Sequence, residues 1–268
     1  MGESAHRVVE ACRIVVVGSG NVATHLARGL HAAGARILQV CSRNAAHASR
    51  LAVEVGAEAI TDLHSVNHGA DVCLISTVDG AVADVAATLP PMKGIVAHTS
   101  GSVPMDVLRC ASDRVGVMYP LQTFSRDRKL DLSSVPFFNE ASDDATLARL
   151  DALAGMISRS VHHADSGTRP FLHVAGVLGC NFPNYLLLCA SQVLARGGYS
   201  LDVLRPLLEE TVAKAFEFGP EASQTGPARR GDAATIERHA SMLPDAQAEI
   251  YRMLSQAITD HYSRNEQD

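Results

Sequence analysis

Residues 13–30 have the sequence RIVVVGSGNVATHLARGL, in which an apolar run is followed by a glycine turn and a helical pattern. Gly18 permits the tight turn, and Gly20 lets the backbone approach a pyrophosphate. Ala23 is the third small residue, needed where the helix packs closely against the strand. Free amide groups at the start of the helix favour phosphate groups. The stretch therefore predicts the strand, turn and helix that open a dinucleotide-binding domain.

The segments around this stretch predict the fold class. As far as His163, short β-branched runs alternate with alanine-rich amphipathic stretches, which is typical of a doubly wound, mostly parallel sheet. After Asp165 the strand pattern ends and helical periodicity continues. The expected strands are 13–17, 36–41, 71–76, 94–98, 114–118, 135–139 and 160–163, and the expected helices are chiefly 22–33, 45–55, 146–157, 168–197, 200–218 and 232–261. We expect an α/β Rossmann domain over residues 1–164 and an all-α C-terminal domain over residues 165–268.

Composition and charge limit the kinds of partner. The chain has 268 residues, of which 47% are apolar, enough to bury one large core or two modest ones. Its 23 Lys and Arg residues against 29 Asp and Glu residues give a net charge of −6. This charge provides no electrostatic attraction for nucleic acid or for an anionic membrane surface. We therefore expect a small-molecule substrate as partner, with no nucleic acid and no membrane.

The expected location is the cytoplasm. The first residues, MGESAHRVVEAC, lack the basic region and long apolar stretch of a signal peptide, and no run of about 18 apolar residues occurs. Six cysteines are scattered without a CxxC pair, and several lie in apolar runs. They are expected to be buried thiols in a reducing compartment.

The end of the second expected strand predicts which dinucleotide binds. Ser42 and Arg43 follow that strand, and no Asp or Glu occurs between Arg36 and Leu51. An acidic residue would be needed there to accept hydrogen bonds from a free ribose 2′-hydroxyl. A hydroxyl and a guanidinium suit a 2′-phosphate instead, because the guanidinium offers charge-assisted hydrogen bonds. The pattern favours NADP(H), and the alternative is that Ser42 and Arg43 only begin a solvated helix.

Two later strand ends supply the rest of the expected cofactor site. LISTVDGAV ends one strand with Ser76, Thr77 and Val78, and IVAHTSGS ends the next with a further pair, Thr99 and Ser100. Open α/β sheets bind ligands at such carboxyl ends, so these groups should line the nicotinamide side. The hydroxyls could equally cap the helix that follows, and both roles can hold together. The expected cofactor contacts are Gly18, Ser19, Gly20, Asn21, Val22, Ser42, Arg43, Ser76, Thr77, Val78, Thr99 and Ser100.

Five motifs, in this order, resemble a known family: GSGNVATHLARGL, HTSGS, YPLQTF, RPFLHVAGVLGCNF and QTGPARRGD. The resemblance is to bacterial Rossmann-like NADP-dependent oxidoreductases whose C-terminal half is a domain of unknown function, and it extends from about Arg13 to Tyr262. The layout is more distantly similar to pyrroline-5-carboxylate reductase, ketopantoate reductase and the β-hydroxyacid dehydrogenases. The resemblance implies an NADP-binding domain, a helical domain that dimerises, and a small substrate held in the cleft between them.

One long helix of the second domain carries the expected catalytic groups. His173, Asn181 and Asn184 recur at helical spacing on one face of an otherwise apolar helix. Buried polar groups need partners or a cavity, and histidine can titrate near neutral pH, so His173 is the expected general acid. The resemblance implies a catalytic lysine at the position of Val177 and a catalytic asparagine at Asn181, so the lysine is missing. Asn184 is expected to contact the substrate. The alternative is that His173 and the amides make helix contacts or a subunit interface.

The motif QTGPARRGD combines turn residues and charges between apolar helices. Thr225, Arg229 and Asp232 should gather, with Arg230, at the start of the helix that follows. Amide and guanidinium groups there favour a carboxylate or a phosphate. We expect Thr225, Arg229 and Asp232 to bind the substrate together with Ser100, or to serve an inter-domain contact. The alternative is that Asp232 is an N-cap and the arginines are simply exposed.

These residues together favour an enzyme. We expect an oxidoreductase that transfers hydride between NADP(H) and a small carbonyl or imine substrate, with His173 as the proton donor. A homodimer formed through the helical domain is implied by the resemblance. No histidine or cysteine spacing predicts a metal site. Because the relatives' lysine is missing, the alternative is a non-catalytic NADP sensor or scaffold with the same dimer.

Overall fold

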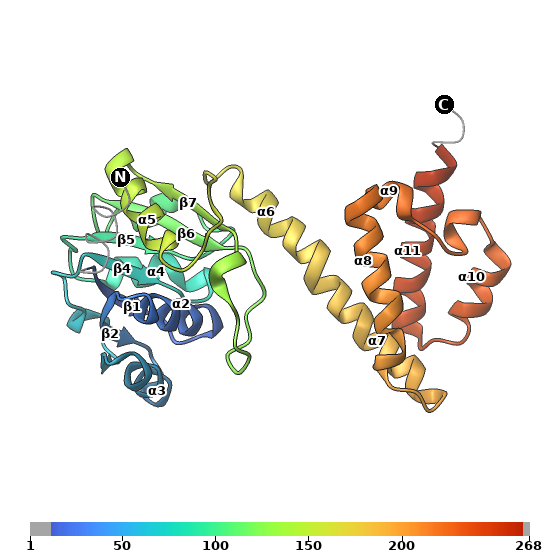
Figure 1. Ribbon diagram of the computed structural model, residues 1–268, viewed down its shortest axis with the longest axis horizontal. Helices are drawn as coiled ribbons and strands as arrows, with labels where there is room; N and C mark the ends of the chain where they lie inside the picture. The colour runs from blue at the N-terminus through green and yellow to red at the C-terminus, as the bar shows by residue number, and fades with distance from the viewer. Residues whose placement is uncertain (1–11, 265–268) are drawn as a thin grey trace. The chain divides into compact units, whose positions relative to one another are not determined.

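The computed structural model describes residues 12–264. The expectation of no signal peptide depends on residues 1–12, and all of these except Cys12 lie outside the described range. The chain forms two compact units that join between Cys180 and Asn181 (Figure 1). We call them the α/β unit, which ends at Cys180, and the helical unit, which begins at Asn181. The expected change from strands to helices near residue 165 occurs. The units nevertheless divide later, inside a helix, because the first turns of that helix pack with the α/β core.

An eight-stranded sheet forms the centre of the α/β unit, in the order β3-β2-β1-β4-β5-β6-β7-β8. The strands are β1 (Arg13–Val17), β2 (Arg36–Cys41), β3 (Glu58–Ile60), β4 (Val72–Ile75), β5 (Ile95–His98), β6 (Val115–Pro120), β7 (Phe137–Ala141) and β8 (Val161–His163). All neighbours pair in parallel except β6 and β7, where Tyr119 lies opposite Phe138 in an antiparallel register. The order reverses between β1 and β4, and sheets of this kind bind ligands at the carboxyl ends of the strands at that point.

Helices cover both faces of this sheet. They are α2 (Asn21–Ala32), α3 (Ala45–Val55), α4 (Val82–Thr88) and α5 (Asp144–Gly155). Successive side chains of a strand point to opposite faces. On β1, Ile14 joins the core under α2, α3 and α5, whereas Val15 joins the core under α4. The predicted α/β Rossmann fold, with its doubly wound and mostly parallel sheet, is confirmed.

The rest of the chain is helical, as the periodicity predicted. The helices are α6 (Arg169–Gly176), the π-helical turn η5 (Val177–Asn181), α7 (Phe182–Arg196), α8 (Arg205–Phe218), α9 (Pro220–Ser223), α10 (Ala233–Ala240) and α11 (Asp245–Arg264). The continuous helix Arg169–Arg196 is long and apolar enough to cross a membrane by length and composition, and its most apolar stretch is unburied. The expectation of no membrane partner therefore stays a prediction.

Three details differ from the expected pattern. The helix expected over 232–261 is two helices, α10 and α11, because Pro244 lies just before α11 and lacks the N–H that a helix interior needs. Strand β3 was not predicted, since three residues are too few to show an alternating pattern. Cys110 and Cys180 are exposed, so the prediction of buried thiols is wrong for them. An apolar neighbourhood in sequence does not decide which side of a turn or helix faces the core.

Candidate functional site

The glycine turn closes the end of β1 against the end of β4. Gly18 has a φ of 125°, a backbone conformation that favours glycine. A Cβ at this position would lie 2.1 Å from the carbonyl oxygen of Ser76, so a larger residue does not fit. The Gly18 amide also donates to the carbonyl oxygen of Cys41 at 2.8 Å. The ends of β1, β2 and β4 therefore meet at Gly18, as a dinucleotide turn requires.

The N-terminus of α2 is open to an anion. Its N-cap, Gly20, provides no side-chain cap, the first turn has no acidic residue, and a Cβ on Gly20 would meet no atom within 4 Å. Helix α3, in contrast, is capped by Asn44, which accepts from the His47 amide at 3.0 Å. The first amides of a helix have no intrahelical partner, and the helix dipole attracts negative charge. The space and donors around Asn21 and Val22 therefore fit the pyrophosphate of a dinucleotide.

Polar groups at the end of β2 lie next to this turn. The Ser19 hydroxyl donates to the Ser42 hydroxyl at 2.8 Å, and Ser42 Oγ also accepts from the Asn44 amide at 3.4 Å. Arg43 is exposed, and its side chain has no hydrogen bond or ion pair with any described residue. A hydroxyl pair beside an unpaired guanidinium fits a phosphate group on the ribose. The individual roles of Ser42 and Arg43 stay predictions.

Side-chain hydroxyls join the ends of β4 and β5. Thr99 Oγ1 donates to Ser76 Oγ at 3.0 Å, and both residues are buried. Ser100 Oγ accepts from the amides of Ser102 and Val103, both at 3.1 Å. The Ser100 hydroxyl therefore caps the turn after β5, which is one of the two roles expected for it.

The two residues after Ser76 face outward from the end of β4. Thr77 is half-buried, and its hydroxyl makes a long contact of 3.4 Å with the carbonyl oxygen of Val78. The Val78 side chain is 71% exposed. An exposed apolar group beside the glycine turn suits the face of a nicotinamide ring, and this role stays a prediction.

A histidine and a tyrosine meet at the ends of β5 and β6. Tyr119 is buried at the end of β6, and its hydroxyl lies 3.2 Å from His173 Nδ1. The turn after β5 packs against both, because a Cβ on Gly101 would lie 2.7 Å from the Tyr119 ring and 2.8 Å from His173 Nδ1. Burial raises the pKa of Tyr119, so its phenol stays protonated and can donate. His173 Nδ1 then accepts, which leaves the proton of a neutral ring on Nε2.

Arg169 fixes the start of the helix that carries His173. It is fully buried, and its Nη1 pairs with Glu140 Oε2 at 2.9 Å. Its other nitrogens donate to the carbonyl oxygens of Ser100 and Val103, at 3.2 and 2.5 Å. A buried charge is tolerated when it is paired and hydrogen-bonded, as here. Arg169 therefore joins α6 to β7 and to the turn after β5, one helical turn before His173.

His98 lies inside the same turn. It is fully buried, and its Nδ1 accepts from the Ser100 amide at 3.1 Å. Burial, followed by the nearby charge of Arg169, lowers the pKa of His98 to about 4. This histidine is therefore neutral near pH 7 and supports the turn, whereas His173 is half-buried beside the site.

Sequence reasoning did not select Tyr119, Arg169 or His98 as site residues. All three lie within the motifs YPLQTF, RPFLHVAGVLGCNF and HTSGS, so a signal was present in the resemblance. Nothing local indicated that Arg169 is buried, since arginine is mostly exposed in proteins. Their roles follow from contacts between segments far apart in the chain.

The helix that carries the other expected groups is not a regular α-helix. Val177–Asn181 forms a π-helical turn just before Pro183, which lacks an N–H and disturbs the hydrogen bonds of the preceding turn. The α-helical spacing is therefore interrupted between His173 and Asn184. The prediction that these residues share one face of a regular helix loses its basis. Asn181 and Asn184 are exposed and belong to the helical unit, whereas His173 belongs to the α/β unit. The roles of both asparagines stay predictions.

The polar turn of the helical unit has internal partners. Asp232 caps α10 by accepting from the Thr235 amide at 3.0 Å, and the hydrogen bonds from Thr235 lower the pKa of Asp232. The Arg229 guanidinium lies 4.3 Å from the centre of the Tyr262 ring. These contacts agree with the structural alternative for Asp232. Binding of substrate by Thr225, Arg229 and Asp232 stays a prediction.

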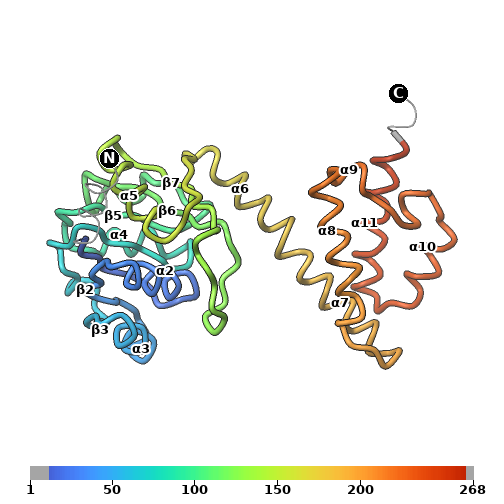
Figure 2. Tube along the Cα trace, viewed as in Figure 1, coloured from blue at the N-terminus to red at the C-terminus, as the bar shows by residue number. Residues whose placement is uncertain are grey.

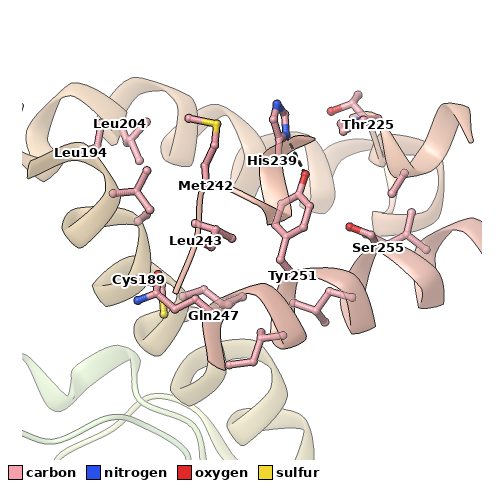
Figure 3. Close-up of a pocket in the computed structure, with 18 residues that line it drawn as sticks. Cys189, Leu194, Leu204, Thr225, His239, Met242, Leu243, Gln247, Tyr251 and Ser255 are labelled. Atoms are coloured by element: carbon pink, nitrogen blue, oxygen red, sulfur yellow. Dashed lines mark hydrogen bonds between the residues drawn. The ribbon is translucent and has the colours of Figure 1, made fainter. Parts of the chain in front are cut away.

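An apolar pocket of about 610 Å³ opens in the helical unit (Figure 3). Figure 3 shows leucine and methionine side chains around it, together with a hydrogen bond of 2.9 Å between His239 Nδ1 and the Tyr251 hydroxyl. Thr225 also lines it. Its lining lies wholly between Leu186 and Ile258, so no expected cofactor residue borders it. The lining suits a hydrocarbon group better than an anion.

Comparisons with known proteins agree with this geometry. Residues 13–99 match the family model described as NADP oxidoreductase coenzyme F420-dependent, and residues 135–258 match a domain of unknown function, DUF2520. A crystal structure from Bacteroides fragilis, assigned as an NADP oxidoreductase, has 39% identity and a TM-score of 0.87, and the alignment covers 94% of this chain and 99% of that one. The chain belongs to this NADP oxidoreductase family. A search of curated proteins finds no match.

More distant solved structures share the fold of this oxidoreductase. A reductive aminase from Aspergillus terreus, in complex with NADPH and ethyl levulinate, has a TM-score of 0.73 at 16% identity, covering 95% of this chain and 94% of that one. An imine reductase from Myxococcus stipitatus, in complex with NADP⁺, has a TM-score of 0.62 at 13% identity, covering 95% and 94%. At such identities the likeness concerns the fold. The predicted family and the predicted cofactor, NADP(H), are confirmed.

Proposed function

We propose that this oxidoreductase uses NADPH to reduce a small carbonyl or imine compound, with His173 as the proton donor. The observation that carries the proposal is the contact between the Tyr119 hydroxyl and His173 Nδ1, at 3.2 Å. It places a residue able to transfer protons at the carboxyl edge of the sheet, where sheets of this kind bind their ligands.

A continuous row of strand ends links the glycine turn to this histidine. Gly18 abuts the Ser76 carbonyl oxygen, and Ser76 is hydrogen-bonded to Thr99. Two residues further on, Gly101 packs directly against the His173 ring. A dinucleotide whose pyrophosphate lies at the glycine turn would extend along this row toward His173. The row therefore supports a reacting centre near Gly101 and His173.

The chemistry needs a hydride and a proton. NADPH supplies the hydride when bound. The proton must reach the oxygen or nitrogen on which negative charge develops, and a positioned side chain typically contributes about 10²- to 10⁴-fold to such a step. In its protonated form His173 can give up the proton on Nε2 and become neutral, while its Nδ1–H donates to the Tyr119 hydroxyl, which fixes the orientation of the ring. Tyr119 is then a positioning residue.

A screen of substrates tests the proposal. The Aspergillus terreus reductive aminase has been crystallised with cyclohexanone and allyl amine, which supports starting with that ketone, alone and with the amine. Cyclic imines, keto acids and aldehydes complete the screen, and loss of NADPH absorbance is the measurement. His173→Gln, close in size but unable to titrate, should lower turnover about 10²- to 10⁴-fold with NADPH affinity unchanged. His68→Gln, at an exposed position, is the matched control. Full turnover of the His173 variant would make the histidine structural.

The second candidate function is a non-catalytic NADP sensor or scaffold. The observation that favours it is the apolar Val177 in the π-helical turn, at the position where the distant relatives have a lysine. Such a protein would bind NADPH with the same affinity and consume none of it with any compound in the screen. Consumption that depends on His173 would exclude this alternative.

We further propose that the protein is a homodimer formed by the helical unit. Large apolar side chains are exposed on α7, α8 and α11, including Phe182 at 56%, Leu207 at 62%, Phe216 at 89% and Met253 at 69%. Burial of apolar surface is favourable by roughly 25 cal/mol per Å², and extensive exposed apolar surface marks interaction sites. A second copy of the chain is the partner that the family resemblance implies.

The proposed location is the cytoplasm. All six cysteines are free, and Cys12, Cys41 and Cys73 are buried thiols whose pKa values burial raises to about 11, 11 and 12. Free thiols are typical of a reducing compartment.

A further inference from the structure

A short segment between β6 and β7 is attached along α2. In Figure 2 it belongs to the green stretch that leaves β6 and runs beside α2. We call residues 124–126 the strap. The Phe124 carbonyl oxygen accepts from Asn21 Nδ2 at 2.8 Å, and the Ser125 carbonyl oxygen lies 3.0 Å from His25 Nε2. The Arg126 carbonyl oxygen accepts from Arg28 Nη1 at 3.3 Å. These three side chains lie on one face of the helix, so the strap is held in a fixed position beside the first turns of α2.

The last residue of the strap, Arg126, reaches back to the glycine turn. Its Nη2 donates to the Ser19 carbonyl oxygen at 3.1 Å, between the two glycines of the turn. Its Nε is buried and has no hydrogen-bond partner among the described residues. A guanidinium has five N–H donors, and a buried donor without a partner is unfavourable because it has lost its hydrogen bonds to water. The side chain is therefore placed beside the turn with much of its hydrogen-bonding capacity unused.

The charge of Arg126 is also uncompensated. No carboxylate among the described residues forms an ion pair with it, and the first turn of α2 contains no acidic residue. A helix N-terminus carries the equivalent of about half a positive charge, so a guanidinium beside it is repelled. An anion bound between Arg126 and the amides of α2 would turn this repulsion into attraction for both groups.

We propose that Arg126 binds the pyrophosphate of NADP(H) and that the strap exists to hold it there. The pyrophosphate is the anion that a glycine turn and a helix N-terminus accept in dinucleotide-binding sheets. Arg126 supplies the side-chain cation, and Asn21, His25 and Arg28 position it through the strap. The inference deepens the proposed function, since it assigns a residue to the same cofactor site.

This role differs from the one expected of Arg43. Arg43 follows β2 and is expected to recognise the 2′-phosphate, which NADPH has and NADH lacks. The pyrophosphate is common to both dinucleotides. Loss of Arg126 should therefore weaken both cofactors by a similar factor, whereas loss of Arg43 should weaken NADPH alone.

The test measures binding of NADPH, NADH and adenosine 2′-phosphate to the full chain by calorimetry. Arg126→Ala should weaken NADPH and NADH about 10- to 100-fold each, the range for hydrogen bonds to a charged group, and leave adenosine 2′-phosphate unchanged. Arg43→Ala should weaken NADPH and adenosine 2′-phosphate and leave NADH unchanged. Arg128→Ala, an exposed arginine two residues beyond the strap, is the matched control and should change none of the three.

Two results would overturn the proposal: unchanged affinity of Arg126→Ala for both dinucleotides, or weakened binding of NADPH and adenosine 2′-phosphate with NADH unaffected. If Arg126→Ala does not fold, Arg126→Lys keeps the charge but loses the fork of donors, and it should still weaken both dinucleotides. Wild-type affinity in the lysine variant would then show that Arg126 is structural. None of these measurements depends on turnover, so they stand whether or not the enzyme reduces a carbonyl or imine. If the unmutated protein did not bind NADPH, the assignment of NADP(H) as its cofactor would be wrong.

Discussion

The α/β unit buries most of its large apolar side chains against its own elements, whereas the helical unit leaves many of its own exposed. Leu74, Phe137 and Leu150 of the α/β unit are fully buried. Phe216 of the helical unit is 89% exposed. The buried residues described in that unit are small: Ala228, Ala240, Ala248 and Ser255. The difference shows that the first unit has a complete core, while the helices need a further surface to cover their apolar side chains.

Separation of the two units tests whether the α/β unit is complete by itself. A fragment ending at residue 180 keeps Arg169 and the whole sheet core, so we expect it to fold and to remain monomeric. The full chain should sediment as a dimer. The expected change is therefore complete loss of self-association, measured by analytical ultracentrifugation. A fragment that dimerised as strongly as the full chain would show that the interface lies on the α/β unit.

Substitution of the buried Arg169 should destabilise the α/β unit. Arg169→Met leaves Glu140 without its buried partner, and breaking such a pair typically costs about 3 to 5 kcal/mol of unfolding free energy. Chemical denaturation of the fragment ending at residue 180 measures this. Arg109→Met, which removes an exposed pair with Asp106, is the control and should change little. Equal effects of the two substitutions would contradict the structural role given to Arg169.

Acid should weaken the α/β unit through His98. Its pKa in the folded state is about 4, below the ordinary value of 6.5, so the unfolded chain binds more protons between these two pH values. The unfolding free energy should therefore fall by about 3 kcal/mol as the pH decreases from 6.5 to 4. His98→Gln should remove this part of the pH dependence, and His68→Gln should keep it. An identical slope in wild type and His98→Gln would show that the buried histidine is not responsible.

The smallest expected effect concerns the choice of dinucleotide. Arg43→Ala should narrow the preference for NADPH over NADH by about 1.5 to 3 kcal/mol, the scale of a hydrogen bond to a charged group. Arg50→Ala, at an exposed arginine within α3, is the control. Equal affinity of the unmutated protein for NADPH and NADH would contradict the recognition of the 2′-phosphate by Ser42 and Arg43.

Several elements of the fold were predictable because their signals are local. The alternation of apolar runs with amphipathic stretches located β1 and β2 with the observed bounds, Arg13–Val17 and Arg36–Cys41. The glycine turn was recognisable because Gly18 and Gly20 stand next to the strand and helix that they join. Strand β3 escaped notice because its existence depends on pairing with β2 rather than on its own three residues.

The candidate site was only partly predictable. The pattern placed His173 among the functional residues, but it relied on regular α-helical spacing that the π-helical turn interrupts. Pro183 was visible in the middle of the helix expected over 168–197, where a proline disturbs the hydrogen bonds of the preceding turn, and the prediction did not use this signal. Asp232 could be given two roles from its position, and only the contact with Thr235 shows that it caps a helix.

The amino-acid sequence was sufficient for the fold class, the cofactor and the family, because these depend on periodicity and on residues adjacent in the chain. Only the tertiary structure could bring Tyr119 to His173, 54 positions apart, and Arg126 to Ser19, 107 positions apart. It alone also buried Arg169 against Glu140. The physical reason is that burial and pairing between distant segments depend on how the whole sheet and its helices pack, which no local pattern records.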